Sequence, residues 1–351
     1  MDKAFIQRRR RDLVVAAFLA AIAAAVPLFV KDVYVQNIMV LTLMYAALSQ
    51  SWNILSGYCG QISLGHALYF GLGAYTTAIL FTKFGVLPWF GMLAGGLISA
   101  LIAMALGYPC FRLGGHYFVI ATIVIAEITL LLFQNWDWAG AALGIDIPVR
   151  RDSWLTFQFT RSKLPYFYFA LALACVAWFV TWWLEDSKWG YWWRAVKDNP
   201  VAAESLGVDV FNSKMGAAAV SAFLVAIGGS FYAQFVSYID PESVMGFQFS
   251  LLMALPAVLG GIGTLWGPML GAVILIPLTE FKVHAAEVAN KVASSALTVT
   301  GGYGYHRGPI ERAFRDARAA IAMGPSNIIA REWIGKAQVG LPLELFYEGG
   351  E

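Results

Sequence analysis

Residues 243–279 read SVMGFQFSLLMALPAVLGGIGTLWGPMLGAVILIPLT, a run of 37 residues that contains no charged side chain. A membrane-spanning helix needs about 20 predominantly apolar residues, so this run is too long for one simple span and too short for two spans with a loop. Its middle contains Gly260-Gly261-Ile262-Gly263, followed by Gly267-Pro268, and such residues break helices. We therefore predict a broken or re-entrant helix followed by a span, with the irregular backbone buried in protein or beside a cavity.

Further runs of membrane-spanning length precede this one. They cover residues 13–30, 34–55, 62–82, 86–111, 117–136, 164–184 and 215–239. Only the run at 117–136 contains a charged residue, which is Glu127. The pattern predicts an all-α fold, a polytopic transmembrane helical bundle of about eight spans or re-entrant segments.

The composition of the whole chain supports this fold class. Hydrophobic residues make up 59% of the 351 residues, the mean hydropathy is +0.64, and only 13% are charged, which is about half the usual share of a soluble domain. These values argue against an ordinary soluble enzyme, and a net charge of +2 provides no basic field for nucleic acid. The three cysteines form no C-x-x-C motif, so neither a disulfide framework nor a metal site is indicated.

Basic residues near the span ends predict the orientation. Arg8-Arg9-Arg10-Arg11 precede the first run, so we expect a cytoplasmic N-terminus, and the parity of the spans then places residues 185–214 in the cytoplasm as well. The alternative for residues 8–30 is a cleaved signal peptide. We favour an uncleaved first span, because its apolar run is longer than the usual 7–15 residues.

A short helix is predicted inside the cytoplasmic stretch. Asn199 suits the N-cap, Pro200 the first helical position, and Gly207 the end of the helix. The surface of this helix is small and rich in alanine. Such a helix can dock into a groove on a soluble partner, or it can be a loop helix that lies on the membrane.

Two polar features lie within the predicted spans. Residues 57–66 (GYCGQISLGH) suggest either an opened helix end whose free backbone groups line a transport pathway or a tight turn between two spans. In that segment His66 is more often a hydrogen-bonded packing residue than a proton relay. The carboxylate of Glu127 costs free energy in a membrane, so two interpretations are open. Glu127 is a pathway or coupling residue, or it makes a buried structural hydrogen bond with Gln134 or a neighbouring helix. The candidate pathway residues are Gly57, Gly60, Gln61, Ser63, Gly65, His66, Glu127, Gly260, Gly261 and Gly263.

Residues 1 to about 281 resemble the permease subunits of bacterial ATP-binding-cassette importers for branched-chain amino acids, of the LivM type. The resemblance is carried by residues 55–66 (LSGYCGQISLGH) with 71–75 (GLGAY), by 117–127, by 194–208 (RAVKDNPVAAESLGV) and by 259–268 (LGGIGTLWGP). It implies that the short cytoplasmic helix is the coupling helix that sits in the ATPase subunit. The matching positions are Asn199, Pro200, Ala202, Ala203, Glu204 and Gly207.

The resemblance also implies a bacterial inner-membrane protein with several partners. These are a second permease subunit, two ATPase subunits, an extracytoplasmic substrate-binding protein and membrane lipid. We expect no cofactor in this chain, because Gly335-Lys336 is followed by Ala337 and lacks the glycine loop of a phosphate-binding motif, so partner subunits would bind ATP. After Thr279 the family continues into a further apolar span, which this chain lacks.

Residues 282–351 read instead as soluble amphipathic helix and resemble the C-terminal piece of acyl-CoA dehydrogenases. The resemblance is carried by residues 285–290 (AAEVAN), 301–305 (GGYGY) and 310–318 (IERAFRDAR). In that family the glycine loop helps to hold the flavin, and the matching positions are Gly301, Gly302, Tyr303 and Gly304. Met323 stands where the family often has its carboxylate base, so we expect neither FAD nor dehydrogenase activity.

Three functional hypotheses follow. The first is a permease subunit (residues 1–281) fused to a dehydrogenase-like tail (282–351), inactive by itself and working in branched-chain amino-acid import. The second is a membrane-anchored fragment of a flavin-dependent acyl-CoA dehydrogenase. The third keeps the permease and changes the cargo to urea, short amides or a sugar.

Overall fold

The structure is a computed structural model that describes residues 3–30, 32–113, 115–148, 153–159 and 162–280. The chain divides into two compact units, Met1–Ile276 and Pro277–Glu351. All residues that carry the resemblance to acyl-CoA dehydrogenases, including Gly301, Gly302, Tyr303 and Gly304, lie outside the described residues.

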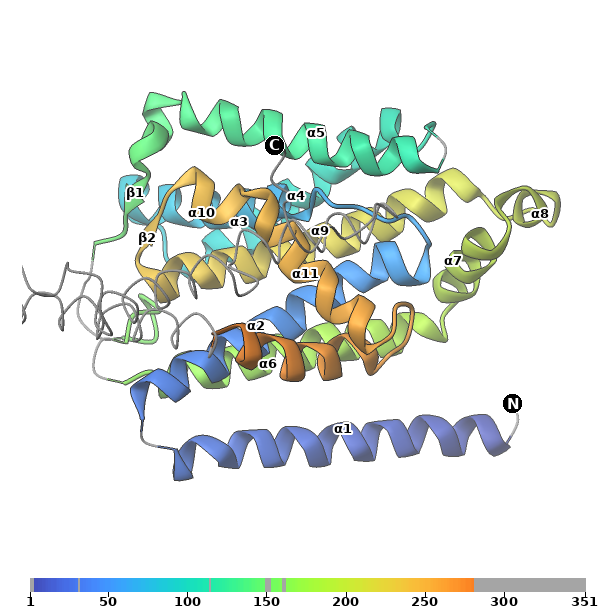
Figure 1. Cartoon of the computed structure of the whole chain (residues 1–351), viewed down its shortest axis with the longest axis horizontal. Helices are drawn as coiled ribbons and strands as arrows, with labels where there is room; N and C mark the ends of the chain where they lie inside the picture. The colour runs from blue at the N-terminus through green and yellow to red at the C-terminus, as the bar shows by residue number, and fades with distance from the viewer. Residues whose placement is uncertain (1–2, 31, 114, 149–152, 160–161, 281–351) are drawn as a thin grey trace, which may run out of the picture. The chain divides into compact units, whose positions relative to one another are not determined.

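The described part of the first unit is a bundle of α-helices with one short antiparallel strand pair (Figure 1). The elements are α1 (Lys3–Phe29), α2 (Val33–Asn53), the π-helix η1 (Ile54–Tyr58), α3 (His66–Phe84), α4 (Pro88–Cys110), α5 (His116–Gln134), the 3₁₀ turns η2 (Asp137–Ala139) and η3 (Ala141–Leu143), β1 (Ile145–Asp146), α6 (Leu164–Glu185), α7 (Lys188–Asp198), α8 (Pro200–Ser205), α9 (Val210–Val236), β2 (Tyr238–Ile239), α10 (Pro241–Met245) and α11 (Phe247–Gly260). The helix Gly267–Glu280 follows and reaches the end of the described residues.

Among the described residues, seven helical segments are long and apolar enough to cross a membrane, which confirms the predicted polytopic bundle. They are Arg9–Phe29, Val33–Tyr58, Pro88–Cys110, His116–Gln134, Leu164–Glu185, Val210–Val236 and Pro241–Gly260. The predicted span at 62–82 corresponds to α3, which begins only at His66 and is not among the seven. Its glycine, tyrosine and threonine residues lower its hydropathy, and neighbouring helices bury most of its length.

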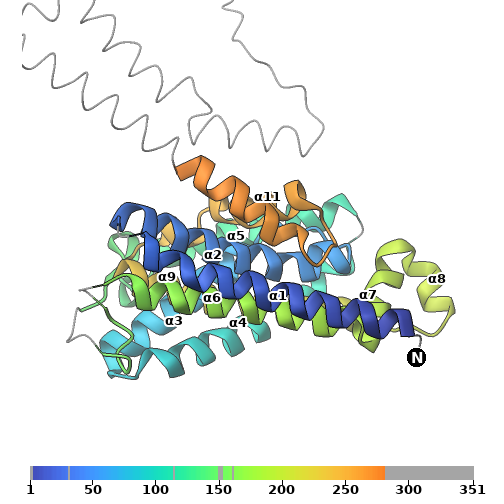
Figure 2. The same ribbon diagram turned by 90° about the horizontal axis from the view of Figure 1, so that it is seen from below.

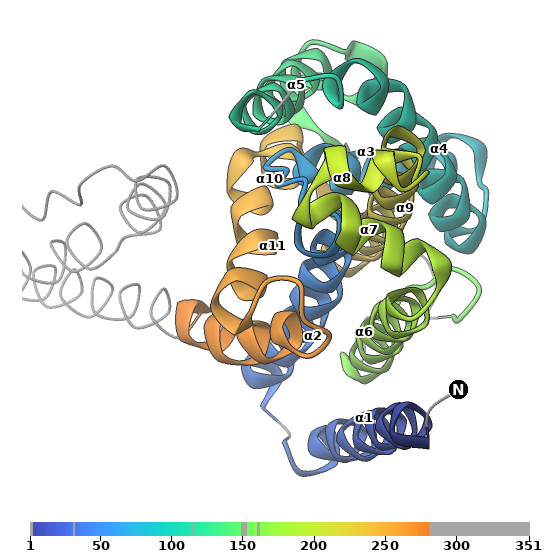
Figure 3. The ribbon, with the colours of Figure 1, turned by 90° about the vertical axis from the view of Figure 1, so that its right-hand side faces the viewer.

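The centre of the bundle is the close contact of α3 with α9 (Figure 3). A Cβ atom at Gly229 would lie 1.9 Å from the backbone oxygen of Phe70, and one at Gly73 would lie 2.0 Å from that of Ala226. The Ser230 hydroxyl donates a hydrogen bond across this contact to the Gly73 oxygen, at 2.9 Å. The small residues therefore let two helix backbones approach closely, as is typical of helix packing in membranes.

The uncharged run that begins at residue 243 is broken where the glycines predict. Helix α11 ends at Gly260, Gly261 and Gly263 have φ angles of +117° and +75°, and a new helix starts at Gly267. These φ values are accessible to glycine without strain. The prediction of a broken helix is confirmed, and the segment of spanning length is the one that precedes the break.

The N-terminal end of α1 and the pair α7–α8 lie at the same end of the bundle (Figure 1). Helix α1 runs along α6 (Figure 2), and the Arg9 guanidinium lies 3.4 Å from the Asp186 carboxylate and 4.0 Å above the Trp182 ring. The predicted common side of the N-terminus and residues 185–214 thus agrees with the structure. That this side is the cytoplasm stays a prediction.

Candidate functional site

The predicted coupling helix is α8, which projects beyond the other helices at one end of the bundle (Figure 1). The Asn199 side chain caps it by accepting hydrogen bonds from the backbone N–H groups of Val201 and Ala202, at 3.0 and 3.1 Å. Pro200 occupies the first turn, and Gly207 ends the helix with a φ angle of +82°. The caps confirm the local prediction, because Asn, Pro and Gly act at these positions through local geometry.

The side chains of α8 divide into an inner and an outer set. Ala203 is buried, at 2% exposure, in the cluster that also contains Trp193. Ala203 therefore packs α8 against the bundle and does not face outward, and its place in the coupling helix stays a prediction. The outer set includes two apolar residues that the sequence analysis missed, Val201 at 73% and Leu206 at 85% exposure. Ala202, Glu204 and Gly207 are exposed beside them.

Within the predicted segment 57–66, residues 59–65 form a hydrogen-bonded connection between η1 and α3. The Gln61 N–H donates to the Leu55 oxygen at 3.1 Å, and the Leu64 N–H donates to the Thr122 hydroxyl at 3.2 Å. The Trp52 indole donates to the Ser63 oxygen at 2.7 Å. These three backbone groups are therefore not free, because the Leu55 oxygen of η1 and the side chains of Thr122 and Trp52 pair with them. A place of this segment in a transport pathway stays a prediction.

His66 is fully buried at the start of α3, and both of its ring nitrogens have hydroxyl partners. Nδ1 lies 3.1 Å from the Ser63 hydroxyl and Nε2 lies 2.9 Å from the Ser221 hydroxyl. The Ser221 hydroxyl donates its proton to the Ser51 oxygen at 2.8 Å. The arrangement consequently suits a neutral ring whose Nε2–H donates to Ser221, and it matches a packing residue.

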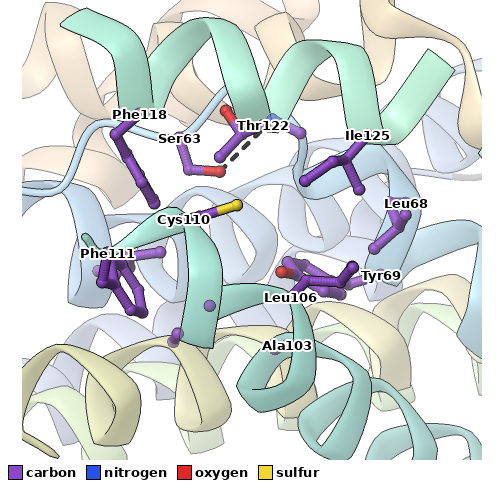
Figure 4. A pocket seen from close by; sticks show the side chains of 14 residues that line it. Ser63, Leu68, Tyr69, Ala103, Leu106, Cys110, Phe111, Phe118, Thr122 and Ile125 are labelled. Atoms are coloured by element: carbon purple, nitrogen blue, oxygen red, sulfur yellow. Dashed lines mark hydrogen bonds between the residues drawn. The ribbon is translucent and has the colours of Figure 1, made fainter. Parts of the chain in front are cut away.

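A small pocket adjoins this connection, lined by Ser63, Tyr69, Cys110 and Thr122 among mostly apolar residues (Figure 4). Gly65 also lines it, beside the backbone of Thr122. The pocket encloses about 30 Å³, which is room for water and far too little for an amino acid. In this conformation the pocket is therefore closed to an amino acid.

The broken helix is clamped to the end of α2 by Asn53, which is fully buried. The Asn53 amide nitrogen donates to the Thr264 oxygen at 3.0 Å, and its amide oxygen accepts from the Gly263 N–H at 2.7 Å. Gly260 lies against the backbone of Gly267, where a Cβ atom would be 1.8 Å from the carbonyl oxygen. The sequence analysis missed Asn53, although an amide in an apolar run is a signal of a buried hydrogen bond.

Glu127 is exposed on α5. Helix α5 itself lies at the edge of the bundle (Figure 3). The neighbours of Glu127 on the same face, Val124 and Ile128, are 49% and 51% exposed. The predicted partner Gln134 is 3.5 Å from the Glu242 carboxylate instead. Within the described residues no hydrogen bond or ion pair of Glu127 is present, so the predicted buried hydrogen bond is not seen in this part of the chain, and a role of Glu127 in the pathway stays a prediction. The rotation of α5 about its axis turns Glu127 away from the core.

Comparison with known proteins adds two family matches. The profile described as branched-chain amino acid transport system / permease component matches residues 34–299, which extends past the predicted boundary at 281. The profile of the C-terminal domain of acyl-CoA dehydrogenases matches residues 276–339 and overlaps the first. No solved structure matches.

Individual relatives are transport permeases. The chain is 30% identical over 284 residues to the high-affinity branched-chain amino acid transport system permease protein LivM of Salmonella typhimurium, covering 75% of this chain and 66% of that protein. It is 25% identical to the nucleoside permease NupC of Lactococcus lactis, covering 65% and 75%. It is 22% identical to the branched-chain permease LivH of Salmonella typhimurium, covering 66% and 79%. The chain thus spans slightly less than two thirds of the length of LivM.

Proposed function

The chain belongs to the family of permease components of branched-chain amino acid transport systems, and we propose that it forms part of the translocation pathway of an ATP-driven importer for branched-chain amino acids. It is a transport subunit and not an enzyme, since its family and its LivM relative are transport permeases. The acyl-CoA dehydrogenase match covers only residues 276–339.

The observation that carries the proposal is the exposed apolar surface of α8. Val201 and Leu206 project from a helix that is capped at both ends and held to the bundle by Ala203. A rigid helix that presents small and apolar residues suits a groove on a soluble subunit. We propose that the ATPase subunit provides that groove and that α8 is the coupling helix.

The exposed position of Glu127 supports a second permease subunit as partner. A carboxylate in the middle of a membrane-spanning helix costs several kcal/mol when it faces lipid, of the order of 3 kcal/mol on insertion scales. Because Glu127 faces away from its own bundle, a second subunit that packs on α5 would cover it or enclose it in a wet passage. Similarity to both LivM and LivH, two permeases of one bacterium, supports a pair of related subunits.

The remaining partners of the proposal follow from the importer class. An extracytoplasmic binding protein would deliver the amino acid at the end of the bundle opposite α8, and two ATPase subunits would bind ATP. We propose the bacterial inner membrane as the location, with a cytoplasmic N-terminus. The similarity to NupC supports a second candidate cargo, a nucleoside.

Uptake in reconstituted vesicles tests the proposal. The full chain would be combined with the second permease, the ATPases and the binding protein of the same organism, and ATP-dependent uptake of radiolabelled leucine would be measured with unlabelled isoleucine, valine, guanosine and urea as competitors. Competition by isoleucine and valine is the expected result. Competition by guanosine or urea alone would show that the proposed substrate is wrong and that the cargo is a nucleoside or urea. The absence of any ATP-dependent uptake would refute the proposal of an importer.

Two variants test the docking role. Glu204→Arg places a cation on the outer face of α8, and Gly207→Val forces a β-branched residue into a left-handed conformation. Both should abolish co-purification of the ATPase and leave membrane insertion intact. A matched control is Gly85→Val, a helix-ending glycine with φ +67° and open space at its Cβ position, at the other end of the bundle. Normal ATPase recovery with both α8 variants would contradict the assignment.

A further inference from the structure

Three segments that are far apart in the sequence meet at the end of the bundle where α7 and α8 lie. They are the turn after η1, the break between α11 and the helix that follows it, and the last turn of α7. The meeting residue on α7 is Lys197. A Cβ atom at Gly60 would lie 2.9 Å from Cγ and 3.2 Å from Cα of Lys197, and one at Gly263 would lie 2.8 Å from its Nζ. The lysine side chain therefore runs from the turn to the break.

The two glycines make this contact possible for two separate reasons. Gly60 and Gly263 have φ angles of +73° and +75°, which other residues adopt only with strain. A side chain would also be crowded at both positions, at Gly60 by the stem and Cα of Lys197 and at Gly263 by the Lys197 Nζ and the Gly57 carbonyl oxygen, which lies 2.9 Å from a Cβ atom there. Gly57 closes the arrangement, since a Cβ atom at Gly57 would lie 2.7 Å from the Gly263 backbone nitrogen.

The contact is connected at both ends to rigid elements. On one side Asn53 fastens residues 263 and 264 to α2 through two hydrogen bonds. On the other side Lys197 precedes the N-cap residue of α8 by two positions, and the N–H of that residue, Asn199, still donates to the Ala195 oxygen of α7 at 3.1 Å. Helix α7 is itself held by the Trp193 indole, which donates to the Ser213 oxygen at 2.9 Å. The corner between α7 and α8 is thus continuous and hydrogen bonded.

Charge pairing does not explain the position of Lys197. Within the described residues it makes no ion pair, hydrogen bond or cation–π contact, and it lies on the exposed side of α7. Its contacts are steric, with the stem against Gly60 and the tip against Gly263. A side chain of this reach touches both loops at once, and a shorter one does not.

We propose that Lys197 is a positioning residue that transmits movement of α8 to the turn at 57–60 and to the helix break at 261–266. The inference rests on the proposed function, because the movement of α8 comes from the ATPase that docks there. Since the stem of Lys197 lies against Gly60 and its tip against Gly263, we expect a displacement of the α7–α8 corner to move at least one of the two loops. Binding at α8 is one event and its transmission through Lys197 is another, so the two can be separated by mutation.

The test compares three substitutions in the reconstituted full complex. Lys197→Ala removes the whole stem, and Lys197→Met keeps the stem at Gly60 but does not reach Gly263. Lys197→Arg retains the reach. We expect the alanine and methionine variants to lower leucine uptake per ATP hydrolysed by about tenfold, a typical size of coupling between two sites, with unchanged ATPase co-purification. The arginine variant should retain coupling. Lys188→Ala, at the other end of α7, is the matched control.

Cys59 supplies a native reporter of movement, because it lies next to Gly60 and is fully buried. Burial raises the pKa of the Cys59 thiol to about 12, so little reactive thiolate is present at pH 7. In a Cys110→Ser, Cys175→Ser background, vanadate trapping of the ATPase should increase maleimide labelling of Cys59 in the wild type. The Lys197→Ala and Lys197→Met variants should not show this increase.

The outcomes separate this inference from the proposed function. Absent ATPase association or uptake in the wild-type complex overturns the proposed function itself, together with the inference that rests on it. Normal wild-type uptake with normal coupling and normal Cys59 labelling in both short variants overturns the role of Lys197 alone. If Lys197→Ala fails to assemble, Lys197→Met, which keeps the contact with Gly60, decides the question.

Discussion

Replacement of Asn53 by alanine should open the helix break at 261–266. The substitution removes two hydrogen bonds, to the Thr264 oxygen and from the Gly263 N–H, which join segments about 210 residues apart in the sequence. A hydrogen bond contributes about 0.5–1.5 kcal/mol net, and a buried partner left unsatisfied costs about 1–3 kcal/mol. We therefore expect Asn53→Ala to destabilise the closed form of the break by about 2–4 kcal/mol, which raises the equilibrium constant for its opening about 30- to 700-fold.

Hydrogen exchange measures this opening directly. In the purified full chain, the amide of Gly263 should exchange faster by the same factor in Asn53→Ala, and peptides that cover residues 261–266 should show it by mass spectrometry. Asn135→Ala is the matched control, because the Asn135 amide is exposed and donates only to the nearby Leu131 oxygen at 2.8 Å. Unchanged exchange at 261–266 in Asn53→Ala would refute the clamp.

Three further predictions concern packing, docking and the membrane carboxylate. Gly229→Ala should abolish the monodisperse peak of the chain in size-exclusion chromatography, because the new Cβ atom would lie 1.9 Å from a backbone oxygen of α3. Gly85→Ala, whose Cβ atom would lie in open space, should keep that peak. Equal peaks for the two variants would contradict the close α3–α9 contact. Leu206→Asp should lower ATPase co-purification at least tenfold, which corresponds to the loss of about 1.4 kcal/mol of binding free energy when an apolar contact is removed. The yield of membrane-inserted chain should not fall, and normal ATPase recovery would argue against Leu206 as a contact. Glu127→Leu should not lower the yield of the isolated chain, because it removes a carboxylate that faces lipid there, but it should abolish uptake by the complex. Ile128→Leu on the same face should retain uptake, and retained uptake in Glu127→Leu would show that this carboxylate is not part of the pathway.

Local features of the chain could be predicted from the sequence because their causes are local. Runs of apolar residues predict the membrane-spanning helices, since each run is long enough to cross a bilayer by itself. The cap of α8 follows from Asn199 and Gly207, whose preferences depend on the backbone next to them. The break after Gly260 follows in the same way from the glycines that make it.

The rotation and the contacts of the helices are decided only by the tertiary structure. Glu127 faces outward and Ala203 faces inward because packing of the whole bundle sets how α5 and α8 turn about their axes. Asn53 contacts Gly263, and Lys197 contacts Gly60, across long separations in the sequence, so no local sequence pattern predicts these contacts. The sequence by itself therefore determined that the chain is a membrane helix bundle with a short capped helix and a glycine break. The folded structure decided which of these parts touch, because contacts between helices depend on the joint packing of many side chains.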